Sequence, residues 1–386
     1  MPIPRTPPAA TAPLLCLSLM LVPVAAAPKN APPSIRTAVL TALEGLDVTA
    51  DEELDAAADA AAGEVLGSEG EAGTGGKAVQ EAVLSEIREH GVTDARVLPL
   101  VITAGSIEDL AASLGQMLEE KWAPLLDGRT IGVGARAGDG RAACVIVAVD
   151  RVLRLEGVVS AIAKPAKLLL KGAIVREAGA LQVIVQSPDL EFFKPTLAIK
   201  GKAFSVLLPL DGGEGCYRIE ILGDLGFGPA VLNLFTTCVG EAAGGSGAAW
   251  PSGATLDAGK AKNRAWALFH MINGLRSSRG LGALKVEGLL TAAALEHGRD
   301  MKANGFFGHT SPTAGTFEAR MKKAGITSTS VAEVLAVADG PEKAFENLAA
   351  SPSHLSQMLG GGYTAMGVAA VKASEGWLFV AVIAAL

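Results

Sequence analysis

The chain has few aromatic residues, few cysteines and no long basic stretch. Aromatic residues make up 4% of its 386 residues, and the formal net charge is −7. Without a basic stripe, nucleic acids and anionic membranes are poor candidate partners. Scarce aromatics also argue against base stacking. Only four cysteines are present, so the chain is not a small disulfide scaffold.

The remaining composition is that of a folded α+β protein. Apolar residues make up 49% and charged residues 19% of the chain, so packed cores are feasible and wholesale disorder is excluded. A length of 386 residues predicts two or three domains.

The N-terminus has the pattern of a secretory signal. Arg5 gives a weak positive region, residues 14–22 an apolar core, and residues 24–27 small side chains for cleavage. The apolar run is short for a membrane span, although an uncleaved anchor is the alternative. Residues 1–27 are therefore predicted to be a signal peptide and residues 28–35 a Pro-rich tether, which makes the protein secreted or periplasmic.

We expect the exported chain to begin at Ala27 or Pro28 and to be soluble, because small residues follow the short apolar core. Intact-mass measurement on the exported protein checks this. Recovery of residues 1–24 in a membrane fraction would contradict it.

Cleavage would remove Cys16 and leave three cysteines. Cys216 and Cys238 flank two short apolar runs around the turn at Gly226 and Gly228. A hairpin folded there sets the two cysteines opposite each other, which predicts a disulfide in an exported chain. Cys144 lies in an apolar run and is interpreted as a small buried hydrophobe.

The hydrophobic pattern and the segments rich in Gly, Pro and Ser divide the chain after the tether into four parts. Residues 36–152 mix amphipathic helical runs with a short strand at 141–149. Residues 153–240 hold short runs separated by Gly, Pro and Asp, which favour a small antiparallel β-sandwich. These runs are 167–174, 180–186, 204–208, 217–222 and 231–239. A Gly/Ala/Ser-rich linker at 241–258 precedes the last domain, 259–386.

The first and last domains resemble each other. Ile131-Gly132-Val133 before a strand matches Met366-Gly367-Val368 before another, and helical residues 106–122 fall on 341–357 without a gap. Such a distant repeat indicates a duplicated domain. The alternative is two unrelated helical segments of similar composition.

The last domain contains a series of spaced polar and glycine-marked elements. They are Asn273 and Arg276 before Gly280-Leu281; Ala293, His297 and Met301; Gly305-Phe306-Phe307; His309 to Pro312; Arg320; Gly325; Glu333; Ser351-Pro352-Ser353-His354; and Met366-Gly367-Val368. In this order they resemble the CAP superfamily (cysteine-rich secretory proteins, antigen five and pathogenesis-related proteins) in its bacterial form. The resemblance covers about a third of the chain, from Asn263 to Leu386.

The resemblance implies an α-β-α sandwich with His309, Glu333 and His354 in one solvent-accessible cleft. Two imidazoles and a carboxylate have the chemistry of a divalent metal site, zinc or calcium, or of a general acid/base set. In the alignment of the two copies these three positions fall near Gly75, near Pro99 and opposite Glu119. The first copy is therefore predicted to be degenerate, with a role in packing or partner binding.

Other polar residues near the motif have plainer interpretations. Glu318 would supply a second acid to the cleft, although a solvated helix position explains it better. His297 is interpreted as a core or helix-face histidine. Family members commonly carry Asn-Ile or Asn-Leu after the glutamate and Trp before the Ser-Pro box, whereas this chain has Val334-Leu335 and Leu348. These departures favour binding over catalysis.

Two functional hypotheses follow. The first is an extracytoplasmic binding module with a cleft for a lipid, peptide or glycan. The second is a metal-dependent hydrolase that uses His309, Glu333 and His354.

Overall fold

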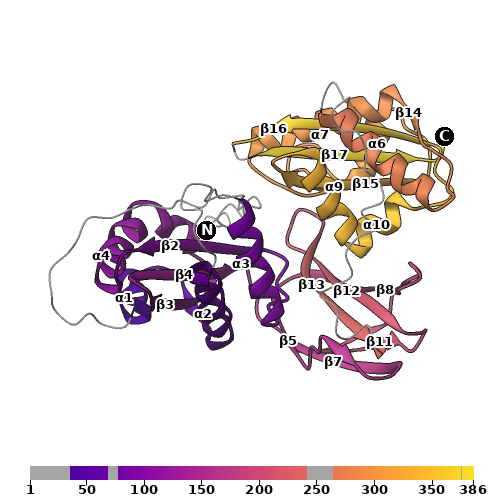
Figure 1. The fold of residues 1–386 in the computed structure, drawn as a ribbon. Coiled ribbons are helices and arrows are strands. Elements are labelled where there is room, and N and C mark those ends of the chain that lie inside the picture. Colours follow the sequence, from indigo (N-terminus) through magenta and orange to yellow (C-terminus); the bar gives the residue numbers. More distant parts are fainter. Residues whose placement is uncertain (1–34, 68–76, 241–263, 375) are drawn as a thin grey trace, which may run out of the picture. The chain divides into compact units, whose positions relative to one another are not determined.

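A computed structural model describes residues 35–67, 77–240, 264–374 and 376–386 (Figure 1). The predicted signal peptide, the linker and nearly all of the tether lie outside these residues. The chain divides into two compact units, one ending at Arg154 and one running from Leu155 to Leu386. Within the described residues, no helix is both long and apolar enough to cross a membrane. The protein is of the α+β class, as predicted.

The first unit is built on a sheet of order β1-β3-β4-β2. Every residue of β4 from Ala142 to Val149 is fully buried, because helices cover both faces of the sheet. Its strands are β1 (Thr49–Ala50), β2 (Val97–Ala104), β3 (Thr130–Gly138) and β4 (Arg141–Val149). Its helices are α1 (Ile35–Ala42), α2 (Glu52–Gly67), α3 (Lys77–Glu89), α4 (Ile107–Met117) and α5 (Ala123–Leu126), with a π-helical turn, Leu118–Trp122, between the last two.

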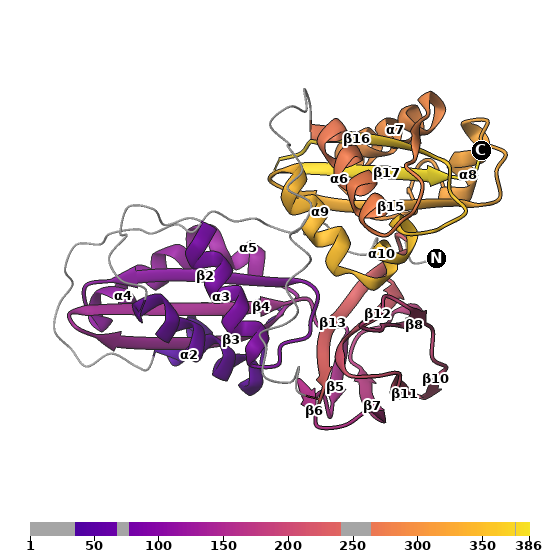
Figure 2. The ribbon, with the colours of Figure 1, turned by 45° about the vertical axis from the view of Figure 1, so that its right-hand side comes forward.

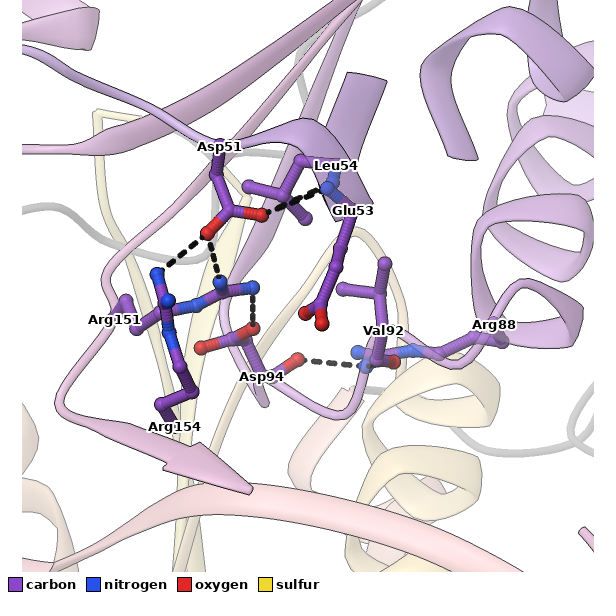
Figure 3. A network of polar contacts seen from close by, with 8 residues as sticks. All are labelled: Asp51, Glu53, Leu54, Arg88, Val92, Asp94, Arg151 and Arg154. Atoms are coloured by element: carbon purple, nitrogen blue, oxygen red, sulfur yellow. Dashed lines mark hydrogen bonds and ion pairs between the residues drawn. The ribbon is translucent and has the colours of Figure 1, made fainter. Parts of the chain in front are cut away.

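A buried ion-pair network joins the start of α2 to the residues that follow β4 (Figure 3). Asp51 accepts hydrogen bonds from two backbone N–H groups in the first turn of α2 and from Arg151 Nη1 and Arg154 Nη2 at 2.7 and 2.8 Å. Arg151 Nη2 also donates to Asp94 Oδ2 at 3.0 Å. Two guanidinium groups thus face two carboxylates, which satisfies charges that burial would otherwise penalise. The network fixes where the chain leaves the first unit.

Residues 153–240, the middle domain, form two sheets of order β10-β11-β7-β5 and β6-β13-β12-β8-β9. All five predicted runs lie in strands, namely β7, β8, β11, β12 and β13. The pairs β10–β11, β11–β7, β12–β13, β12–β8 and β8–β9 are antiparallel, and β6 pairs with β13 in parallel. The strands are β5 (Leu153–Glu156), β6 (Ala161–Ile162), β7 (Ala166–Ile174), β8 (Gly179–Gln186), β9 (Phe192–Phe193), β10 (Leu197–Lys200), β11 (Ala203–Leu210), β12 (Gly215–Asp224) and β13 (Pro229–Val239).

A disulfide closes the base of the β12–β13 hairpin. Cys216 and Cys238 are direct partners in the strand register and are bonded to each other. At the other end, Asp224 Oδ1 accepts hydrogen bonds from the backbone N–H groups of Gly226 and Gly228 at 2.7 and 3.1 Å. The hairpin is therefore fixed at its base and at its tip. Cys144 is buried and free.

We expect one titratable thiol in the exported, unreduced and denatured chain, and three after reduction. The single thiol is Cys144, since Cys216 and Cys238 are bonded. Reduction should destabilise the middle domain by about 3 kcal/mol, because the bond restricts the unfolded chain. Thiol counting with a chromogenic disulfide reagent checks this, and three thiols before reduction would contradict it.

The C-terminal domain is a three-layer α-β-α arrangement around a sheet of order β14-β16-β17-β15 (Figure 2). On β17, Phe379 and Ala381 pack on the side of α6 and α9, whereas Val380 and Val382 pack on the side of α7 and α8. Alternate side chains of one strand thus supply two cores. The strands are β14 (Lys285–Val286), β15 (Val331–Ala338), β16 (Ala365–Lys372) and β17 (Trp377–Ala384). The helices are α6 (Arg264–Ser278), α7 (Gly288–Asn304), α8 (Phe317–Lys323), α9 (Pro341–Ala350) and α10 (Pro352–Met358).

Candidate functional site

Glu333 is the centre of a buried polar network in the C-terminal domain. It is the third residue of β15 and its side chain is 1% exposed. Arg320 on α8 donates to both carboxylate oxygens, with Nη2 2.8 Å from Oε1 and Nη1 3.1 Å from Oε2. His309 Nδ1 lies 3.0 Å from the same Oε1. Two of the predicted site residues, His309 and Glu333, are therefore in direct contact.

These partners determine the ionisation of Glu333. Burial alone raises the pKa of this carboxyl, but hydrogen bonds from His309 and Arg320, with the charges of His297 and Arg320, outweigh it and hold the pKa below its ordinary value. Glu333 is thus a carboxylate at neutral pH. Because the carboxylate accepts from His309 Nδ1, the neutral imidazole carries its proton there and leaves Nε2 as an acceptor. The His309 side chain is 21% exposed, so this acceptor is within reach of a ligand.

The loop that carries His309 is held from three directions. Gly305 ends α7 in the left-handed conformation, with φ 63°, and turns the chain into this loop. Arg320 Nη2 donates to the carbonyl oxygen of His309 at 2.9 Å. His297 Nε2 lies 2.9 Å from the carbonyl oxygen of Gly308. Together these contacts hold the backbone of the loop from which the His309 ring reaches Glu333.

His297 is a core histidine, as interpreted from the sequence, and it also borders the network. Its Nε2 lies 3.7 Å from Glu333 Oε1. Desolvation lowers the pKa of His297, although the charge of Glu333 opposes this. A neutral ring with its proton on Nε2 therefore donates to Gly308. Sequence reasoning missed this contact, because His297 is on α7 and Gly308 follows 11 residues later in the loop, whose return to the helix is not set by local pattern.

Ser311 beside His309 serves the loop. Its Oγ accepts hydrogen bonds from the backbone N–H groups of Thr313 and Ala314 at 3.0 and 2.7 Å. Asp300 on α7 in turn accepts from Thr313 Oγ1 at 2.9 Å. Ser311 is thereby used as a turn-forming hydroxyl, which leaves it poorly suited as a nucleophile for His309.

His354 stands near His309 but outside the Glu333 network. It lies in the first turn of α10, where Ser351 caps the helix and Pro352 begins it. Desolvation, and to a lesser extent the charge of His309, lower the pKa of His354 to about 3. In the described residues, the His354 side chain makes no hydrogen bond with Glu333.

The middle domain contributes two residues to the surroundings of these histidines, and sequence reasoning missed both. Glu220 of β12 is fully buried and accepts hydrogen bonds from Ser351 Oγ at 2.5 Å and Ser353 N–H at 2.8 Å. Burial raises the pKa of Glu220 despite these hydrogen bonds. One sequence signal exists, which is a carboxyl between two isoleucines, Ile219 and Ile221, in the middle of a predicted strand.

Phe227, at the tip of the β12–β13 hairpin, is the second contribution. Its carbonyl oxygen accepts from Thr310 N–H at 2.9 Å, and its ring stacks on Phe306 with centroids 5.5 Å apart. A Cβ on Gly308 would lie 2.5 Å from that carbonyl oxygen, so glycine is required for this close approach. The His309 loop therefore rests on a neighbouring domain.

Two polar residues of the family pattern serve the scaffold. Arg276 on α6 is 1% exposed and donates to the carbonyl oxygens of Met358 and Gly360 at 2.8 and 2.9 Å. Asn273 exchanges two hydrogen bonds with the backbone of Leu284. These contacts hold the end of α10 and the approach to β14.

The residues fit the predicted metal site poorly. Both oxygens of Glu333 are already paired with Arg320, and a guanidinium in that position repels a cation. Over the described ranges, no three His, Cys, Asp or Glu residues are grouped so that they would hold a metal ion. Glu318 is exposed on α8, on a different side of the helix from Arg320. The expectation of three residues lining a solvent-accessible cleft also needs correction, because Glu333 lies beneath the surface and supports His309 from below.

Comparisons with known proteins address the C-terminal part of the chain. Residues 269–384 match the model of CAP, the cysteine-rich secretory protein family. No curated protein matches the chain.

Solved structures with similarity include bacterial proteins of this type. An extracellular protein with an SCP domain from Bacillus anthracis is 17% identical, with 58% of this chain and 68% of that chain covered and a TM-score of 0.30. A cysteine-rich secretory protein from Staphylococcus aureus is 13% identical, with 56% and 76% covered and a TM-score of 0.29. An outer surface protein from Borrelia burgdorferi is 22% identical, with 30% and 88% covered and a TM-score of 0.29.

The match covers Arg320, Glu333, His309 and His354. Residues 269–384 are a CAP domain of the cysteine-rich secretory protein family.

Proposed function

We propose that the protein is an extracytoplasmic binding protein whose CAP domain takes a lipid, peptide or glycan beside His309 and His354. The pairing of Glu333 carries this proposal. With Arg320 on both oxygens and His309 on one, the carboxylate has no role left as a base. It holds His309 so that Nε2 offers an acceptor to a hydroxyl or amide of the ligand.

The state of His354 supports binding over catalysis. A general base works best when its pKa is near the working pH. The pKa of His354 is about 3, so this ring stays neutral and transfers protons poorly near neutral pH. A neutral ring in a desolvated position is well suited to hydrogen bonding and apolar contact.

Two features support a location outside the cytoplasm. The N-terminal pattern is that of a signal peptide, and the Cys216–Cys238 disulfide requires an oxidising compartment. Fractionation of the native host distinguishes the periplasm from the cell exterior.

The test is binding to one probe of each ligand class, namely palmitate, chitotetraose and a tryptic digest of casein, measured by calorimetry on the exported chain. We expect one class to bind, and His309→Ala to weaken binding about tenfold or more, as for the loss of a hydrogen bond to a buried polar partner. Glu318→Ala is the matched control because Glu318 is exposed on α8, and it should leave affinity unchanged. Equal affinities of His309→Ala and the unaltered chain would contradict the proposal.

The alternative is a metal-dependent hydrolase that uses His309, Glu333 and His354. The neutral ring of His354 beside His309 is the observation in its favour, since neutral imidazole is the metal-binding form. Metal binding by Glu333 would require its carboxylate to break the ion pair with Arg320. Elemental analysis for zinc and calcium separates the two proposals: an equimolar ion that is lost in His309→Ala or His354→Ala would favour the hydrolase.

We also propose that residues 36–152 are a second, degenerate CAP-like copy. The sheet orders β1-β3-β4-β2 and β14-β16-β17-β15 support this, because corresponding strands occur in the same chain order. A Cβ on Gly132 would lie 2.0 Å from the backbone of Leu54 in α2, and one on Gly367 would lie 2.0 Å from the backbone of Thr291 in α7. In each sheet, a helix thus packs closely against a glycine of the second strand in sheet order.

In this correspondence the first copy has no counterpart of His309, Glu333 or His354. Pro99 is the third residue of β2, as Glu333 is of β15. An experimental structure tests the duplication: superposing the two sheets should set Pro99 on Glu333. A superposition that sets Gly132 and Gly367 on different strands would contradict it.

A further inference from the structure

One face of the middle domain departs from the usual pattern of a soluble sheet. In β11, Phe204, Val206 and Leu208 are buried, and Leu207 between them is 49% exposed on the opposite face. Leu169 of β7 is likewise 50% exposed. Single exposed leucines are ordinary on protein surfaces, whereas an exposed apolar patch indicates an interaction site. The question is therefore whether these two leucines lie together.

The strand register gathers these leucines with three lysines. Leu207 pairs directly with Leu169, so the two side chains lie side by side on the same face. Lys171 and Lys167 lie two residues on either side of Leu169 on β7, and Lys200 of β10 pairs with Ala203 of β11 on that same face. We call these five residues, Lys167, Leu169, Lys171, Lys200 and Leu207, the lysine–leucine face. Strands β10, β11 and β7 carry it side by side (Figure 2).

The positive charge of the lysine–leucine face is largely uncompensated. Lys167 lies 3.9 Å from Asp211, and both side chains are about half exposed, at 58% and 45%, so solvent screens this pair. Lys171 and Lys200 have no ion pair within the described residues. The formal net charge of the whole chain is −7, but this face is locally positive.

We propose that the lysine–leucine face docks on the surface of an anionic lipid bilayer. Lysine stems lie along apolar surface while their ammonium groups reach phosphates, and leucines between them enter the boundary between headgroups and acyl chains. A sheet face fits a planar partner better than a small molecule. A second copy of the chain fits less well, because two such faces would oppose lysine to lysine. This proposal is independent of the CAP site and departs from the expectation, drawn from the lack of a basic stripe, that anionic membranes are poor candidate partners.

The test is cosedimentation of the exported full chain, of known intact mass, with two kinds of vesicle. One contains phosphatidylcholine mixed with phosphatidylglycerol, and the other contains phosphatidylcholine alone. We expect binding to the anionic vesicles only, weakened by salt. Because each lysine near an anionic surface contributes about fivefold in affinity, Lys171→Glu with Lys200→Glu should weaken binding about 25-fold or more.

Matched controls separate the face from overall charge and hydrophobicity. Lys302→Glu with Lys322→Glu makes the same charge change at exposed positions of α7 and α8, and should retain most of the binding. Leu169→Gln with Leu207→Gln should weaken binding, whereas Leu289→Gln, at a leucine 54% exposed on α7, should not.

Three results would overturn the proposal. These are equal binding to both kinds of vesicle, equal losses in the face and control variants, and a dimer in solution that the Leu169→Gln and Leu207→Gln changes dissociate. Circular dichroism of each variant checks that its fold is kept.

Discussion

Replacing Arg320 by methionine is expected to destabilise the CAP domain by about 3–5 kcal/mol, because it leaves a buried carboxylate without its partner. The side chains of Arg320 and Glu333 are 7% and 1% exposed, so water cannot replace the lost guanidinium. The measurement is a urea titration in which a brief amide-exchange pulse reports on β17, a central strand of this domain.

Two variants control this experiment. Arg320→Met with Glu333→Gln removes both charges and should regain a large part of the lost stability. Lys323→Met, on the same helix, breaks an ion pair whose members are 71% and 68% exposed, and should change stability by less than about 1 kcal/mol. An Arg320→Met variant as stable as Lys323→Met would show that the network contributes little.

Acidification from about pH 7 to about pH 5 is expected to destabilise the CAP domain by about 2 kcal/mol through His354, and His354→Gln should abolish this contribution. The folded pKa of His354 is about 3 and its ordinary value is 6.5. Between these two pKa values, His354 is protonated in the unfolded chain and neutral in the folded chain. Stability therefore rises with pH between the two values and falls on acidification. A non-titrating residue at position 354 removes that dependence.

Urea titrations across this pH range, read by the same exchange pulse, measure the difference between the slopes. The lowered pKa of His297 acts in the same direction, but this residue is present in both proteins and cancels. His270→Gln, at an exposed position of α6, controls for the loss of an imidazole. Parallel slopes for the unaltered chain and His354→Gln would mean that this ring is not desolvated in the folded protein.

Periodicity and turn chemistry were enough to predict five of the nine strands of the middle domain. The runs on either side of Gly226 and Gly228 are short, similar in length and bounded by turn residues, so their pairing followed from local sequence. Strand β2 was missed for a physical reason. Its residues are nearly all apolar, without alternation, and Pro99 lies among them. A proline is tolerated there because β2 is at the edge of its sheet.

The site was predictable only in part. The family pattern named His309, Glu333 and His354, and the contact between the first two follows from it. The partners that determine their chemistry lie far away in sequence or in another domain: Arg320 is 13 residues from Glu333, and Glu220 is 131 residues from Ser351. Contacts of that kind depend on how layers pack, which neither propensity nor spacing specifies.

The docking of Phe227 and Glu220 against the CAP domain also has a consequence for the order of assembly. Synthesis proceeds from the N-terminus, so β12 and β13 are complete before Arg264, the first residue of α6, is added. Until then Glu220 faces water and Phe227 has no Phe306 to stack on. Since domains form as units from the N-terminus, we expect the middle domain to be folded before the CAP domain completes its His309 loop. A chain truncated before Arg264 leaves Glu220 and Phe227 without their partners and exposes both residues to proteases.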